Sequence, residues 1–197
     1  IPHKITLQGL DKKIDITSLF LDKYGKIWIG TMGKGIYILD PENEQYRVFN
    51  ENNVFENASI LSINGRNNTV FASSLQGAMI IELSDKNKTI HEPYRFTNYD
   101  NNTTGTNYIY TIFKDSKNRT WFATDGRGLT MMQQNVFTYF NGKKQIKDDH
   151  IYSITEDAKG NIWFSTASAG IYKFDGKQFF NYQEKEGLSD LTVSALK

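Results

Sequence analysis

The pentapeptide Ile27-Trp28-Ile29-Gly30-Thr31 decides the fold, because copies of it recur along the chain. Two close copies are Thr120-Trp121-Phe122-Ala123-Thr124 and Ile162-Trp163-Phe164-Ser165-Thr166, and a weaker one is Val70-Phe71-Ala72-Ser73-Ser74. The aromatic residues at the second position of these copies are 43, 50 and 42 residues apart. A period of roughly 40–50 residues with many short β-strands is typical of the blades of a β-propeller.

Each copy is predicted to be the second of four strands in one small antiparallel sheet. The first strand has the pattern apolar-x-Ser/Thr-apolar, the third follows a glycine, and the fourth is aromatic, as in Phe179-Phe180-Asn181-Tyr182. Four short strands joined by tight turns predict one blade. The sequence therefore predicts an all-β fold of about four blades from a seven-bladed propeller, near residues 16–50, 60–99, 109–141 and 151–183.

The two ends of the chain are expected to belong to incomplete flanking blades. Residues 184–197 contain Leu191–Leu196, which resembles a first strand, and residues 1–15 contain a candidate last strand. We therefore expect the whole of residues 1–197 to be one partial propeller. Open apolar blade faces and unpaired strand edges at its ends would favour a homodimer.

The repeated residues themselves are interpreted as structural. Trp28, Trp121 and Trp163 should pack between blades, since they keep a fixed place in the second strand. The small residue two positions after each aromatic residue should let neighbouring blades approach. An aspartate opens three of the turns after the first strand, where it can cap backbone N–H groups. The hydroxyl residue that ends each second strand should bond into the following loop, at Thr31, Ser74, Thr124 and Thr166.

Composition excludes several classes of function. The formal net charge is +1 and no basic stripe occurs, so nucleic acid is not an expected partner. No apolar run approaches the ~18–20 residues that span a bilayer, so no membrane contact is expected for this segment. The chain has no cysteine, and its 3 histidines are scattered. No metal site, cofactor or catalytic set is predicted.

The fourth copy carries a recognisable family pattern. The stretch Ile151–Thr166, followed by Gly170–Asp175 and the linker Glu186–Asp190, resembles the two-component regulator propeller repeat. The second copy departs from it, because Phe71 replaces tryptophan and Asn64-Gly65-Arg66-Asn67 replaces the aspartate turn. The resemblance implies the periplasmic sensor region of a hybrid two-component histidine kinase of Bacteroidetes, which detects an oligosaccharide and has no enzymatic activity of its own.

The loops between second and third strands are the candidate site, because the repeat does not fix their polar residues. In a propeller they share one face with the loops that lead into each first strand, so they could form a polar rim edged by aromatic rings. The candidate ligand-binding residues are Lys34, Gln76, Asp125, Arg127, Tyr108 and His150.

Two other functions stay open on the sequence. A protein-docking scaffold would show an exposed apolar patch on one face. A propeller lyase or glycosidase would need clustered acids, a His-Tyr pair or metal ligands near the axis, and no such cluster is visible in the sequence.

Overall fold

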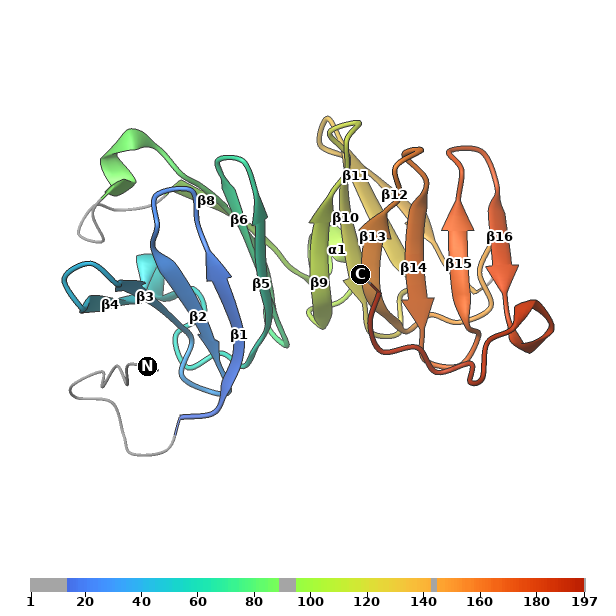
Figure 1. Cartoon of the computed structure of the whole chain (residues 1–197), viewed down its shortest axis with the longest axis horizontal. Helices are drawn as coiled ribbons and strands as arrows, with labels where there is room; N and C mark the ends of the chain where they lie inside the picture. Colours follow the sequence, from blue (N-terminus) through green and yellow to red (C-terminus); the bar gives the residue numbers. More distant parts are fainter. Residues whose placement is uncertain (1–13, 89–94, 143–144, 197) are drawn as a thin grey trace. The chain divides into compact units, whose positions relative to one another are not determined.

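The computed structural model describes residues 14–88, 95–142 and 145–196. The chain forms two compact units, residues 1–97 and 98–197, and the boundary falls inside the last strand of the second sheet. The described elements form four four-stranded antiparallel sheets, and in each sheet the strands follow one another in chain order (Figure 1). The expected all-β fold of four blades is confirmed.

The sheets have the following strands. The first contains β1 (Ile16–Leu21), β2 (Ile27–Thr31), β3 (Ile36–Asp40) and β4 (Gln45–Phe49). The second contains β5 (Ile60–Arg66), β6 (Thr69–Ser74), β7 (Gly77–Glu82) and β8 (Arg95–Tyr99). The third contains β9 (Ile109–Lys114), β10 (Thr120–Thr124), β11 (Leu129–Gln133) and β12 (Val136–Phe140). The fourth contains β13 (Ile151–Glu156), β14 (Ile162–Thr166), β15 (Ile171–Phe174) and β16 (Phe179–Tyr182).

The helical segments are short and lie between strands or after the last one. They are the 3₁₀ turns η1 (Glu51–Asn53), η2 (Asp85–Lys88) and η3 (Glu184–Glu186), and the single α-helical turn α1 (Asn101–Thr104). The α1 turn is capped at both ends: Asp100 accepts a hydrogen bond from the backbone of Asn102, and Gly105 closes the turn at φ +80°. None of the described helices is long and apolar enough to cross a membrane.

The aspartate of each predicted turn binds the tryptophan of the following strand. One Asp22 oxygen accepts from the backbone N–H groups of Tyr24 and Lys26, and the other accepts from Trp28 Nε1 at 2.9 Å. The pairs Asp115–Trp121 and Asp157–Trp163 repeat this indole bond at 2.8 and 2.9 Å. The predicted capping role is confirmed, and the same carboxylate also satisfies the indole donor of the core tryptophan.

The second sheet departs from this arrangement in the way its sequence indicates. Its first strand extends to Arg66, which pairs with Thr69 across a two-residue turn, and Asn67 adopts φ +55°. Asparagine tolerates this left-handed conformation. No carboxylate is needed in this turn because the side chain of Phe71, at the tryptophan position, has no N–H donor to satisfy.

The core of the first unit lies between its two sheets. Trp28 is fully buried in a cluster with Ile38, Ile60 and Met79. A methyl group added at Gly30 would lie 2.7 Å from Ile60 Cγ2, so the small residue lets the second sheet approach β2 closely, as expected.

The core of the second unit likewise lies between its third and fourth sheets. Trp121 is fully buried beside Ile151, Phe164 and Tyr172. Trp163 in the fourth sheet is only partly buried, because no further sheet of the described second unit packs over it.

Of the two flanking strands predicted at the ends of the chain, only the one near residue 191 lies within the described residues. The predicted strand from residue 191 onward does not form within the described residues 191–196. Instead, Val193 N donates to Thr166 O and Leu196 N donates to the hydroxyl of Ser153. The Leu191 carbonyl nevertheless accepts from Gly170 N, just as Ala58 accepts from Gly35 N ahead of β5. The candidate strand before Gly9 lies outside the described residues.

Candidate functional site

The candidate site lies at one edge of the sheets, here called the loop edge, where each second strand turns into the third. The hydroxyl that ends each second strand donates to the carbonyl of the glycine before or at the start of the third strand. The four bonds are Thr31–Gly35 at 2.7 Å, Ser74–Gly77 at 3.0 Å, Thr124–Gly128 at 2.6 Å and Thr166–Gly170 at 2.9 Å. The predicted structural role of these hydroxyls is confirmed.

The segments that lead into the first strands lie at the same edge. The residue after each hydroxyl donates its backbone N–H to the carbonyl just before the first strand, for example Asp125 N to Tyr108 O at 3.0 Å and Ala167 N to His150 O at 3.1 Å. The two kinds of loop that carry the candidate residues are therefore joined by backbone bonds within each sheet.

The structure brings together only some of the candidate residues. Lys34 and Gln76 are exposed at the loop edge of the first unit, in different sheets. In the second unit, the exposed His150 ring lies 3.4 Å from Asp125, measured from Nε2 to Oδ1. Tyr108 and Arg127 are exposed on loops of the same sheet as Asp125.

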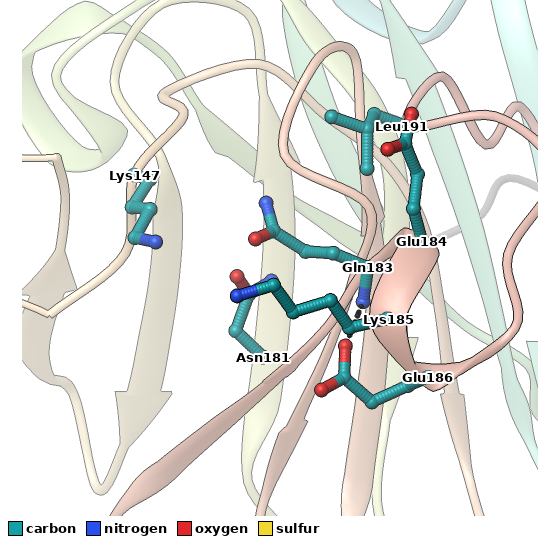
Figure 2. A pocket seen from close by; sticks show the side chains of 7 residues that line it. All are labelled: Lys147, Asn181, Gln183, Glu184, Lys185, Glu186 and Leu191. Atoms are coloured by element: carbon teal, nitrogen blue, oxygen red, sulfur yellow. Dashed lines mark hydrogen bonds between the residues drawn. The ribbon is translucent and has the colours of Figure 1, made fainter.

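One pocket opens beside the fourth sheet of the second unit, with a cavity volume of about 350 Å³. Figure 2 shows the side chains of Lys147, Gln183 and Lys185 pointing toward one another across it. Asn181, on β16, also lines it and donates to the carbonyl of Ala169 at 2.7 Å. The residues that line the pocket are Lys147, Asn181, Gln183, Glu184, Lys185, Glu186 and Leu191.

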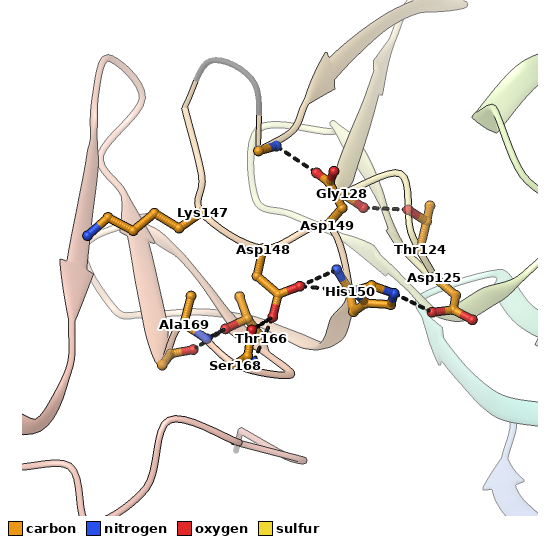
Figure 3. A network of polar contacts seen from close by, with 12 residues as sticks. Thr124, Asp125, Gly128, Lys147, Asp148, Asp149, His150, Thr166, Ser168 and Ala169 are labelled. Carbon is orange, nitrogen blue, oxygen red and sulfur yellow. Dashed lines mark hydrogen bonds and ion pairs between the residues drawn. The ribbon is translucent and has the colours of Figure 1, made fainter.

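A buried carboxylate organises the loop next to this pocket. Asp148 Oδ2 accepts from both the backbone N–H and the hydroxyl of Ser168, at 2.6 and 2.8 Å. Its Oδ1 accepts from the backbone N–H of His150 at 2.9 Å and lies 3.0 Å from the ring Nδ1 of the same residue. Figure 3 shows the imidazole held between Asp148 and Asp125, with Lys147 pointing away from it.

The protonation of Asp148 follows from these contacts. Burial by itself would raise the pKa of the Asp148 carboxyl, but the hydrogen bonds from His150 and Ser168 favour the charged form more strongly. The net effect lowers the pKa of Asp148 below its usual value. The carboxylate is therefore a charged anchor that joins the lead-in segment of β13 to the β14–β15 loop.

Aromatic rings border this polar cluster. Tyr110 on β9 and Tyr152 on β13 meet edge to face, with ring centroids 5.0 Å apart, at the seam between the third and fourth sheets. Burial, together with the charge of Asp125 and the neighbouring Tyr152, raises the pKa of the Tyr110 phenol. Tyr108 keeps 50% of its surface exposed. Its ring is therefore available for stacking.

This arrangement is suited to binding. The Ser168 hydroxyl donates to Asp148 and not to His150, so the three residues do not form the serine–histidine pair of a nucleophilic enzyme. Among the described residues, no group of three or more histidines, cysteines and carboxylates is placed to hold a metal ion. What the cluster does offer is donors and acceptors beside an exposed aromatic ring.

Sequence reasoning missed Asp148, Ser168 and the residues of the pocket. Lys147 and Asn181 are 34 residues apart and carry no repeated pattern. Asp148 could have been noticed, because it lies two residues before the candidate residue His150.

The fold resembles several solved propeller structures. The extracellular domain of a putative hybrid two-component system from B. thetaiotaomicron matches with a TM-score of 0.75 and 21% identity, covering 89% of this chain and 24% of that one. The extracellular domain of a putative one-component system from the same organism gives a TM-score of 0.66 and 18% identity, over 85% of this chain and 24% of that one. Virginiamycin B lyase from Staphylococcus aureus gives a TM-score of 0.63 and 14% identity, over 88% of this chain and 57% of that one. At these identities the likeness shows the fold alone.

Sequence comparison identifies the repeat. No curated protein sequence matches the chain. The model of the two-component regulator propeller family matches residues 10–33, 105–126 and 145–168. These stretches run into the second strands of the first, third and fourth sheets and end in the loops after them. The chain therefore carries three copies of the two-component regulator propeller repeat.

Proposed function

We propose that the chain is part of the extracytoplasmic, ligand-sensing propeller region of a hybrid two-component sensor. The observation that carries this proposal is the threefold match to the two-component regulator propeller repeat. The likeness to extracellular domains of two B. thetaiotaomicron signalling systems supports it. The chain spans 24% of the length of each of these two domains. The protein in this proposal resides in the inner membrane, and the described propeller faces the periplasm.

The proposed ligand is an oligosaccharide that binds at the loop edge of the second unit. Saccharides combine hydroxyl groups, which need donors and acceptors, with C–H faces that stack on aromatic rings. In this proposal the exposed Tyr108 ring provides the stacking surface, and Asp125, Arg127 and His150 bind hydroxyl groups. The anchoring of the lead-in segment through Asp148 supports a site that is formed before the ligand arrives.

Signalling in this proposal is a shift of population between two states of a dimeric kinase, which controls transcription through a response regulator. The ligand can favour one state only if it binds that state more tightly. A homodimer is supported by the first sheet, where Leu19 and Leu21 of β1 are each 62% exposed. β1 is an edge strand of this sheet. Exposed leucines on an edge strand are typical of a surface that pairs with another chain.

The proposal is tested by titrating the chain with a panel of neutral and acidic oligosaccharides in a calorimeter. The double variant Tyr108→Ala/Arg127→Ala should bind the best ligand at least about tenfold more weakly, because it loses both the stacking ring and a charged donor. Arg66→Ala, at the turn on the opposite edge of the second sheet, is the matched control. If no saccharide binds, or if the double variant binds like the native chain, the proposed ligand or site is wrong. Steady release of a cleaved product would instead favour a lyase or a glycosidase.

A further inference from the structure

We infer that the pocket lined by Lys147, Asn181, Gln183 and Lys185 is a binding site for the anionic group of an acidic saccharide. The saccharide part of this inference rests on the proposed function, whereas the anionic part rests on the pocket itself. The site is separate from the Tyr108–His150 cluster, because Lys147 points away from His150 on the other side of the same loop (Figure 3).

Backbone contacts hold both walls of the pocket. On one side, the backbone N–H of Lys147 donates to the hydroxyl of the buried Tyr172 at 2.9 Å. On the other side, Leu191 O accepts from Gly170 N at 2.9 Å, and Leu188 N donates to Gln183 O at 3.2 Å. The positions from which the lysine side chains extend are therefore fixed by the fold, and only their flexible stems have to be ordered by a ligand.

The charges of the pocket are not paired with one another. Among the described residues, neither Lys147 nor Lys185 has a carboxylate oxygen within ion-pair distance of its amine. Two carboxylates also line the pocket. Glu186 Oε2 accepts from the backbone N–H of Gln183 at 2.8 Å, and the Glu184 carboxylate lies beside Leu191, away from the two ammonium groups (Figure 2). Two ammonium groups that point toward a shared space, without a protein partner there, form a natural site for an anion.

Neutral polar groups complete the pocket. Asn181 uses its amide N–H groups for the carbonyls of Ala169 and Ile171, at 2.7 and 3.3 Å. Its side-chain carbonyl accepts no hydrogen bond among the described residues, so it can accept one from a sugar hydroxyl. The Gln183 amide also points into the pocket (Figure 2).

The size of the pocket limits the ligand. A cavity of about 350 Å³ is at the small end of the range for ligand sites, which suits one or two sugar rings. The apolar part of the lining comes from Leu191, which can contact the C–H face of a ring. The chemistry shared by the candidate ligands is a carboxylate or a sulfate on a mono- or disaccharide.

The experiment is a calorimetric titration of the 197-residue chain with three probes: digalacturonic acid, N-acetylglucosamine 6-sulfate and the neutral disaccharide cellobiose. We expect at least one acidic probe to bind, and cellobiose to bind at least about tenfold more weakly, because it lacks the group that the two ammonium groups recognise. The two acidic probes distinguish a carboxylate ligand from a sulfate ligand.

Two double variants with the same change in net charge locate the site. Lys147→Ala/Lys185→Ala should weaken binding of the acidic probe at least about tenfold. Lys159→Ala/Lys177→Ala removes two exposed lysines from the turns at the opposite edge of the fourth sheet and should change the affinity less than about twofold. A circular dichroism spectrum like that of the native chain establishes that both variants are folded.

Each remaining outcome has a clear meaning. Equal weakening by both double variants would show attraction to overall charge and would overturn the inference, as would unchanged binding by Lys147→Ala/Lys185→Ala. If cellobiose binds and neither acidic probe does, the inference fails but the proposed function stands. If none of the probes or the wider saccharide panel binds, the inference and the oligosaccharide part of the proposed function both fail.

Discussion

Replacing Asp115 by alanine should be one of the most damaging single changes in the second unit. The Asp115 side chain has no exposed surface and accepts four hydrogen bonds. Two come from the backbone N–H groups of Lys117 and Arg119, at 3.0 and 2.8 Å. The other two come from Arg119 Nε at 2.5 Å and Trp121 Nε1 at 2.8 Å.

The magnitude follows from what the alanine leaves behind. Trp121 is fully buried, so its indole N–H would lose its partner inside the core, which costs about 1–3 kcal/mol. The Arg119 side chain is only 10% exposed, so its charge would lose its counter-ion in a largely desolvated place. Removing one partner of a buried ion pair typically costs about 3–5 kcal/mol, and we expect Asp115→Ala to fall in this range.

The assay is urea unfolding of the second unit, with hydrogen exchange of the Trp121 indole N–H measured by NMR. The midpoint should fall at an unchanged slope, and the indole proton should exchange faster. Asp157→Ala is the matched control, because it removes the same turn cap and indole bond but has Asn161 in place of the arginine. It should cost less than Asp115→Ala. If the free energy of unfolding of Asp115→Ala is within about 0.5 kcal/mol of that of the native chain, the buried carboxylate does not hold this turn together.

The four sheets could be predicted from the sequence because each one is specified by local signals. The aspartate turn, the Trp pentapeptide and the glycine before the third strand all recur within about 20 residues, so they place strands without any knowledge of distant contacts. The observed sheets, Ile16–Phe49, Ile60–Tyr99, Ile109–Phe140 and Ile151–Tyr182, agree with the predicted blades to within one residue at each end.

The hydrogen bond between Asp115 and Trp121 was not predicted from the sequence. Both residues were assigned structural roles separately, one as a turn cap and the other as core. In the antiparallel hairpin Trp121 pairs with Phe113, so its ring lies two residues along the strand from the aspartate. Combining the turn prediction with this register would have placed the indole N–H near the carboxylate.

The candidate site could be predicted only as an edge of the sheets. The common edge of the loops follows from strand direction, and the backbone bond from Asp125 to Tyr108 confirms it. Which side chains meet depends on how neighbouring sheets pack, and only Asp125 and His150 among the predicted residues lie within ion-pair distance of each other in the described structure. Lys147 and Lys185 come together through the path of the chain after β16, for which the repeat gives no signal.

Three further changes test the packing, the loop bonds and the charge of Asp148. Gly30→Ala should destabilise the first unit by about 1–3 kcal/mol in urea unfolding, because the new methyl group would lie 2.5 Å from Ser18 Oγ and 2.7 Å from Ile60 Cγ2. Gly142→Ala is the control: its methyl group meets nothing closer than 3.4 Å, so its free energy of unfolding should be nearly unchanged. Thr124→Val should cost about 1 kcal/mol, since it removes the 2.6 Å bond to Gly128 O; an unchanged unfolding midpoint would show that the backbone alone holds this loop. For Asp148, the pKa of the carboxyl is lower in the folded chain than its usual value of 3.8, so the unfolded chain binds this proton first as the pH falls. The stabilisation by the carboxylate is therefore fully present well above pH 3.8 and is lost as the pH falls below that value toward the folded pKa. Asp148→Asn has no proton to bind at this position, so its free energy of unfolding, measured in urea at pH 7 and at about pH 3, should fall less than that of the native chain. Because other carboxyls, such as those of Asp40 and Asp175, also have lowered pKa values, both proteins will lose stability in acid, and the difference between the two losses isolates Asp148. Equal losses would mean that the bonds from His150 and Ser168 do not favour the charged form, and the carboxylate would then not be the anchor of the β13 lead-in segment.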